Sequence, residues 1–159
     1  MLGKAGIKEK KGRKIKMKIE KYDNYKELIP LYISRGLEVH DGDFYNKHVF
    51  SLIMKNEEGA TIGASTCTQL DENYIIEALV IAENETQKGY GKYLLNNVLN
   101  EIKALNGTNI YLVAKDPKFF EKNGFIIIEK EDAPDFSDCF MCPDYKVCCF
   151  PKILKYIGE

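Results

Sequence analysis

The sequence has no apolar run near the ~18 residues that a membrane-spanning helix needs. Its longest apolar stretches, 79–82 and 125–128, have the length of strands. The N-terminal region also lacks the apolar segment of a secretory signal, so we expect a cytoplasmic protein without a membrane partner. The five cysteines are an odd number, which favours reduced thiols over a disulfide framework.

The chain also has little net charge, a formal −1 at pH 7, but this charge is unevenly distributed. Residues 1–18 hold eight lysines and arginines against one acid, Glu9. Basic arms can bind nucleic acid, but this arm has no aromatic residue to stack on bases. We therefore expect residues 1–16 to be a disordered arm, or an extension before a native start at Met17, and nucleic acid is not an expected partner. Residues 17–159 suffice for a single domain.

The spacing of apolar residues predicts an α+β fold. The only pair of strands expected to be parallel is 74–82 with 109–114, because a helix connects them. The order β-α-α-β-β-β-α-β-α-β-β predicts a mixed, mostly antiparallel sheet. The expected elements are strands at 18–22, 50–55, 60–69, 74–82, 109–114, 125–130 and 147–156, and helices at 25–37, 44–48, 88–105 and 118–123.

The stretch 74–105 combines an apolar strand, a glycine turn and an amphipathic helix. Gly89 and Gly91 stand at the start of the helix, where the lack of a Cβ lets backbone N–H groups approach a ligand closely. These first-turn N–H groups have no helical partner, and the helix dipole is positive there, so the turn favours a phosphate. Lys88 and Lys92 add positive charge. A tight turn that needs glycine for steric reasons is the alternative.

Two common phosphate-binding motifs are excluded for this turn. No GK[ST] follows the glycines, so it is not a P-loop. The third glycine of the dinucleotide-binding motif is missing, and the strand is reached through an antiparallel meander.

The stretch resembles the acetyl-CoA motif of the GCN5-related N-acetyltransferase (GNAT) family, a strand followed by Q/R-x-x-G-x-G/A at the start of a helix. The six positions read here Thr86, Gln87, Lys88, Gly89, Tyr90 and Gly91. Residues 119–125, FFEKNGF, resemble the family's downstream segment, usually written YEKxGF. The element order also matches over 17–156. The resemblance implies a GNAT-like sheet with helices on both faces and an acyl-CoA N-acyltransferase domain over 17–159.

The resemblance also implies where acetyl-CoA, the co-substrate, would bind. The backbone of Leu79, Val80 and Ile81 would pair with the pantetheine arm, and an N–H near Val80 or Ile81 would polarise the thioester carbonyl. The strands that hold Leu79 and Tyr111 would splay apart to admit the thioester. The cofactor-binding N–H groups for the pyrophosphate would come from Gln87, Lys88, Gly89, Tyr90, Gly91 and Lys92.

The implied reaction is direct attack of a primary amine, of a small molecule or a peptide, on the thioester. The amine must be neutral, so a base assists. Glu77 is the candidate catalytic base, because it is the only acid on the central strand. The period of a strand puts it on the same face as Leu79 and Ile81; a solvent-facing charge is the alternative. In several relatives the carboxylate stands two residues earlier, where this chain has Ile75.

The chain departs from the family pattern at two positions. Thr86 stands at the usual Gln/Arg position, and Phe120 replaces a tyrosine that protonates the departing thiolate in many members. Tyr90, Tyr111 and Tyr145 are substitutes between which the sequence does not choose. A second function therefore stays open, a non-catalytic CoA-binding module or a cysteine-based metal- or redox-sensing module.

Four cysteines close together are the most unusual feature of the chain. Zinc binding, a redox-responsive thiol pair, and packing or lining of the acceptor pocket are all open for them, and we assign no metal ligands. The four cysteines are Cys139, Cys142, Cys148 and Cys149.

Two histidines, His40 and His48, are isolated in the sequence, and surface or capping roles are expected for them. The sequence does not specify the acceptor amine or the oligomeric state, which leaves a homodimer open.

Overall fold

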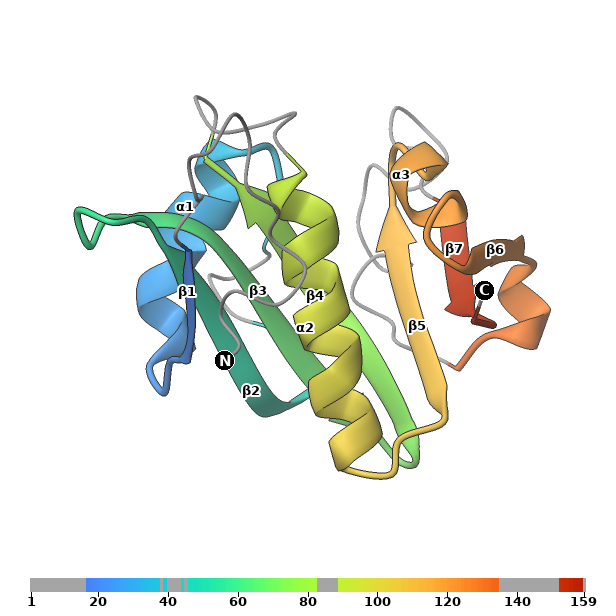
Figure 1. Ribbon diagram of the computed structural model, residues 1–159. Helices are drawn as coiled ribbons and strands as arrows, with labels where there is room; N and C mark the ends of the chain where they lie inside the picture. Colours follow the sequence, from blue (N-terminus) through green and yellow to red (C-terminus); the bar gives the residue numbers. More distant parts are fainter. Residues whose placement is uncertain are drawn as a thin grey trace.

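The computed structural model describes residues 17–37, 39, 44, 46–82, 89–134 and 152–158. Its strands are β1 (Lys18–Lys21), β2 (Lys47–Lys55), β3 (Thr61–Leu70), β4 (Asn73–Ile81), β5 (Asn109–Ala114), β6 (Phe125–Ile128) and β7 (Lys152–Tyr156). They form one seven-stranded sheet in the order β1-β2-β3-β4-β5-β7-β6 (Figure 1). Neighbouring strands are antiparallel except β4 and β5, which are parallel. The predicted mixed sheet with a single parallel pair is confirmed.

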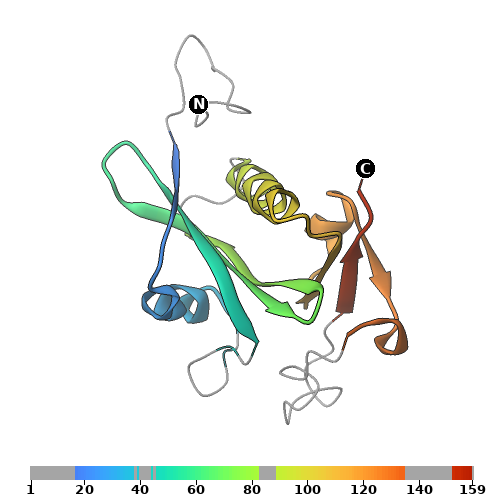
Figure 2. The same ribbon diagram turned by 90° about the horizontal axis from the view of Figure 1, so that it is seen from below.

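The helices are η2 (Tyr25–Leu28), α1 (Ile29–Ser34), α2 (Tyr90–Ala104), α3 (Lys118–Glu121) and η5 (Lys130–Asp132). The two larger ones, α1 and α2, cover opposite faces of the sheet (Figure 2). Leu94 and Leu95 of α2 pack in the larger core cluster with Leu52. Tyr32 of α1 packs in the smaller cluster with Ala64. Helices on both faces, as predicted, therefore bury both sides of β2, β3 and β4.

No helix within the described ranges is long and apolar enough to cross a membrane.

Two local predictions are corrected by the structure. The helix expected at 25–37 is shorter, because a 3-10 turn precedes α1, Pro30 stands in the first turn of α1, and Gly36 follows its end with a φ of +92°. Lys47 and His48, expected in a short helix, belong to β2 and pair with Gln69 and Thr68 of β3. Pairing with β3 outweighs the local helical pattern.

Three further predictions concern residues outside the described ranges. They are the arm at 1–16, part of the short helix expected before β2, and the first part of the last strand, 147–151.

Buried hydroxyl groups connect α1 to the sheet. The side chain of Tyr32 is fully buried, and its Oη lies 2.6 Å from Oγ1 of Thr66. Thr66 Oγ1 also lies 2.8 Å from Oγ of Ser51, and His48 Nε2 lies 3.0 Å from the same Ser51 oxygen. Burial raises the pKa of Tyr32, so the phenol stays neutral and can donate. This string of hydrogen bonds holds α1 to β2 and β3.

Tyr32→Phe should lower the free energy of unfolding by about 1 kcal/mol, because one buried hydrogen bond is lost while Thr66 keeps Ser51 as a partner. Urea unfolding at neutral pH measures the change. Ile33→Ala, at the next position but 52% exposed, is the control and should stay within about 0.5 kcal/mol. Equal stability of the Tyr32→Phe variant and the wild type would contradict the role given to the string.

Candidate functional site

The two parallel strands β4 and β5 stay together for only part of their length. Their pairing runs from Asn73 with Asn109 to Ile75 with Tyr111. Beyond these pairs, β5 continues beside β7, and β4 continues to Ile81 without a described partner on that side. In Figure 1 the strands meet at their lower ends and diverge upward. The predicted splay is present, and the open edge of β4 can pair with an extended ligand.

The glycine turn leads into α2 at the end of β4. Gly89 is the N-cap residue of α2 and has a φ of +81°, which side chains rarely adopt. A Cβ built on Gly89 would meet nothing within 4 Å, so the space beside this turn is open. The first backbone bond of the helix runs from Tyr93 N–H to the Gly89 carbonyl oxygen. The described part, Gly89 to Lys92, therefore has the geometry of a helix N-terminus that attracts anions.

The other residues predicted to bind the pyrophosphate differ in their burial and in whether the structure describes them. Gly91 lies beside Phe119 of α3, and a Cβ there would be in ordinary van der Waals contact with Cζ of Phe119, at 3.4 Å. The Tyr90 side chain is buried in the core beneath α2, and Lys92 is exposed. Gln87 and Lys88 lie outside the described residues.

Glu77 lies in a β-bulge of β4. Ala78 pairs with Thr66 and Ile76 pairs with Cys67, so Glu77 has no opposite residue in β3. A bulge shifts the alternation of side chains along the strand. Glu77 therefore faces α1, two residues beyond the last pair with β5.

The prediction that Glu77 shares a face with Leu79 and Ile81 is wrong. Leu79 and Ile81 pack with the core cluster of α2. Glu77 accepts a hydrogen bond of 2.7 Å from Thr68, two positions from the Thr66 that contacts α1. The extra residue in β4 is the physical reason, because a period of two assumes a regular strand.

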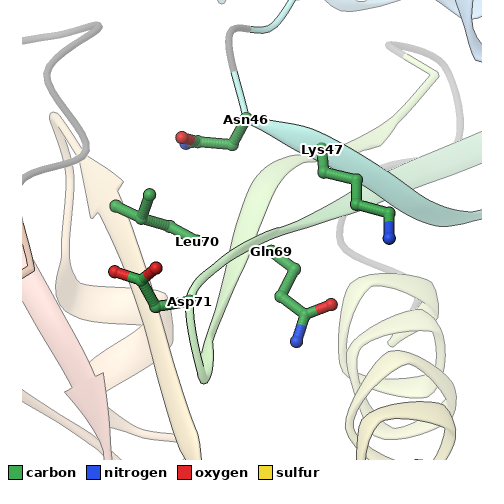
Figure 3. A pocket seen from close by; sticks show the side chains of 5 residues that line it. All are labelled: Asn46, Lys47, Gln69, Leu70 and Asp71. Atoms are coloured by element: carbon green, nitrogen blue, oxygen red, sulfur yellow. The ribbon is translucent and has the colours of Figure 1, made fainter.

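Two polar side chains that sequence reasoning missed surround this carboxylate. Thr68 Oγ1 and Asn46 Nδ2 both donate to Oε2 of Glu77, at 2.7 and 3.2 Å. Thr68 belongs to β3 and Asn46 precedes β2, so no sequence motif joins them to Glu77. Asn46 also lines an open hollow of about 470 Å³ (Figure 3). The hollow is lined by Asn46, Lys47, Gln69, Leu70 and Asp71.

Cys67 of β3 pairs with Ile76, the residue before Glu77, and is fully buried. Burial raises the pKa of its thiol to about 12, and the negative charge of Glu77 adds to this effect. A thiol that stays protonated at neutral pH is a poor nucleophile. Cys67 therefore acts as a core residue.

Phe120 has a packing role. Its ring lies 5.1 Å from that of Phe119 and 5.7 Å from that of Phe125, both edge-on. Of the candidate substitutes for the missing hydroxyl, Tyr111 stands at the last pair between β4 and β5, whereas Tyr145 lies outside the described residues. Tyr111 is thus the described tyrosine at the splay, and Lys155 Nζ lies 5.7 Å from the centre of its ring.

The remaining candidates divide into described and undescribed residues. His48 stacks on Tyr25 at 4.4 Å between ring centres and bonds to Ser51, so its role is structural. Burial lowers the pKa of His48, and the charge of Asp23 only partly opposes this. Within the described ranges no group of three acidic, cysteine or histidine side chains could hold a metal ion. His40 and the four clustered cysteines lie outside these ranges.

Comparison with family models matches residues 20–125 to the acetyltransferase (GNAT) family. The match covers more than half of the chain, so the chain belongs to this family. The resemblance seen in the glycine turn and the FFEKNGF segment is confirmed, together with the enzyme class, an acyltransferase whose co-substrate is acetyl-CoA. No curated protein matches the chain by sequence.

Solved structures show the same fold. A GNAT-family acetyltransferase from Staphylococcus aureus Mu50 superposes with a TM-score of 0.68 at 18% identity, covering 88% of this chain and 98% of that one. N-acetylglutamate synthase from Neisseria gonorrhoeae, in complex with coenzyme A and L-arginine, gives 0.68 at 15% identity, covering 88% of this chain but 32% of that one. Arabidopsis thaliana Naa50, in complex with the bisubstrate analogue CoA-Ac-MVNAL, gives 0.58 at 17% identity, covering 87% and 97%. At these identities the likeness establishes the fold.

Proposed function

We propose that the protein transfers the acetyl group of acetyl-CoA to a primary amine of a small molecule or a peptide. The observation that carries the proposal is the splay of β4 from β5, with a glycine-led helix N-terminus beyond it and a carboxylate on the opposite face. The Naa50 and N-acetylglutamate synthase complexes support it, since they hold a peptide-based bisubstrate analogue and coenzyme A.

In this proposal the backbone does most of the donor binding. The open edge of β4 at Leu79, Val80 and Ile81 pairs with the pantetheine arm as an added strand would. The thioester carbonyl accepts a hydrogen bond from an N–H near Val80, where negative charge develops during attack. The pyrophosphate binds to the N–H groups of the turn, from Gln87 to Lys92.

The chemistry then needs only one proton acceptor. Glu77 takes a proton from the acceptor amine, the nitrogen forms a bond to the carbonyl carbon, and the bond from carbon to sulfur breaks. The thiolate leaves and takes a proton from water, from the acceptor or from another side chain such as Tyr111, because Phe120 has no hydroxyl to donate. Asn46, which donates to Glu77, also lines the hollow, so an amine bound in the hollow would lie close to a partner of the base.

An assay of purified protein with acetyl-CoA and a panel of amines tests the function. The panel should contain polyamines, free amino acids, and peptides with a free N-terminus or an internal lysine. We expect at least one amine to release free thiol in an amount equal to the acetylated product found by mass spectrometry. Binding of acetyl-CoA without turnover on any amine would instead favour the non-catalytic CoA-binding module, which the phenylalanine at 120 supports.

The proposal includes a cytoplasmic location, which the odd number of cysteines supports because it argues for reduced thiols. Cell fractionation tests this location. The boundary between an arm at 1–16 and a domain at 17–159 stays a prediction, as does a homodimer; limited proteolysis and light scattering measure them.

A further inference from the structure

We propose that Thr68 and Asn46 are positioning residues, which hold the Glu77 side chain in its ionised form and aim it at the acceptor amine. The inference rests on the proposed role of Glu77 as the base. It adds two residues from other parts of the chain to that role.

The hydrogen bonds themselves are the first observation. Thr68 Oγ1 and Asn46 Nδ2 donate to the same oxygen, Oε2 of Glu77, from two directions. An ionised carboxylate only accepts hydrogen bonds, so both contacts match the charged form. Thr68 is fully buried, so its hydroxyl cannot exchange this partner for bulk water. Threonine is also stiff at χ1, which keeps the donor in place.

The second observation is the arrangement of the sheet around Thr68. The pairing of β2 with β3 skips Val49, and the pairing of β3 with β4 skips Glu77, while β3 itself stays regular between them. The bulge in β4 leaves Glu77 and Ala78 both on the α1 face, because Ile76 and Leu79 pack with the α2 cluster. The carboxylate is thereby directed back over β3, where Thr68 meets it.

The titratable groups described near Glu77 lie on β2, on β3 and at the adjoining turn. Cys67 on β3 is held neutral by burial, which raises its pKa. His48 on β2 pairs with Thr68 through the backbone, and burial lowers its pKa. Lys47 and Asp71 line the hollow that Asn46 also lines. The amide of Asn46 and the hydroxyl of Thr68 are two donors whose hydrogen bonds favour the ionised form of Glu77.

The predicted effect of Thr68→Val follows from this geometry. Valine has nearly the shape of threonine but no donor, so the carboxylate should take up its proton at higher pH. We expect the acid limb of the pH profile of kcat/KM to move upward by about one unit. The KM for acetyl-CoA should stay within about two-fold, because the splay and the glycine turn are untouched. Asn46→Ala should move the limb in the same direction but less, since its bond is longer.

Thr66→Val is the matched control. Thr66 lies on the same face of β3, is equally buried, and bonds to Tyr32 and Ser51. It should cost stability but leave the acid limb in place. Thr68→Ser keeps the hydroxyl and should restore the wild-type profile.

An acceptor-free measurement accompanies the kinetics. ¹³C NMR titration of labelled glutamate carboxylates follows Glu77 directly, and Glu77→Gln identifies its signal. The midpoint for this signal should rise in Thr68→Val and not in Thr66→Val.

The outcomes distinguish a failure of the positioning role from a failure of the proposed base, Glu77. An inactive Glu77→Gln variant, together with a Thr68→Val variant whose acid limb and NMR midpoint equal the wild type, overturns the positioning role and leaves the proposed function standing. A fully active Glu77→Gln variant overturns the base, and the positioning role with it. A shift in Thr68→Val that is absent in Thr66→Val and reversed by serine supports the inference.

Discussion

Glu77→Gln is expected to lower kcat by about a hundred-fold or more, because general-base catalysis contributes roughly this much. Glutamine has the size of glutamate, and its carbonyl oxygen can still accept the bonds from Thr68 and Asn46. It cannot take a proton from the amine. The KM for acetyl-CoA should hardly change, since the proposed donor contacts are made by backbone groups of β4 and α2. The loss should therefore fall on the chemical step.

Steady-state kinetics across pH separates this effect from misfolding. The wild type should lose activity on the acid side as Glu77 becomes protonated, and the variant's residual activity should lack this limb. Glu101→Gln is the matched control, because Glu101 lies on α2 and its partner is Lys21 on the surface, 3.1 Å away. It should retain activity within about two-fold, as surface ion pairs contribute little. Equal kcat in Glu77→Gln and the wild type would show that another group accepts the proton.

Gly89→Val is expected to raise the dissociation constant of acetyl-CoA by about ten-fold or more. Gly89 has a φ of +81°, so a β-branched residue there is strained by roughly 1–3 kcal/mol. Its side chain would also project into the open space beside the N–H groups proposed for the pyrophosphate. Both effects weaken an anion site that depends on close approach of the backbone.

Gly59→Val distinguishes strain from lost binding. Gly59 has a φ of +82° and also no neighbour within 4 Å, but it lies in the turn between β2 and β3. Both variants should lose similar stability in urea unfolding. Only Gly89→Val should weaken acetyl-CoA in isothermal titration calorimetry. Wild-type affinity in the Gly89→Val variant would place the anion site elsewhere.

Agreement between sequence and structure is best where the relevant residues are neighbours in the chain. The strand, the glycine turn and the helix of 74–105 were predicted from local chemistry, and they appear as β4, Gly89 and α2. The parallel pairing of β4 with β5 followed from the connecting helix. The prediction of a helix at Lys47 and His48 is wrong because the strand that pairs with them, β3, begins more than ten residues further along the chain.

The sequence by itself thus determined the acetyltransferase family and predicted the glycine turn at which we propose that the donor binds, since a glycine turn at a helix start is a contiguous feature whose chemistry lies in the backbone. Only the tertiary structure decided which face Glu77 occupies and which residues hold it. The bulge in β4 breaks the period of two, and the donors Thr68 and Asn46 reach the carboxylate from β3 and the start of β2. Such contacts depend on strand register, which the pairing of whole strands sets and single residues do not encode.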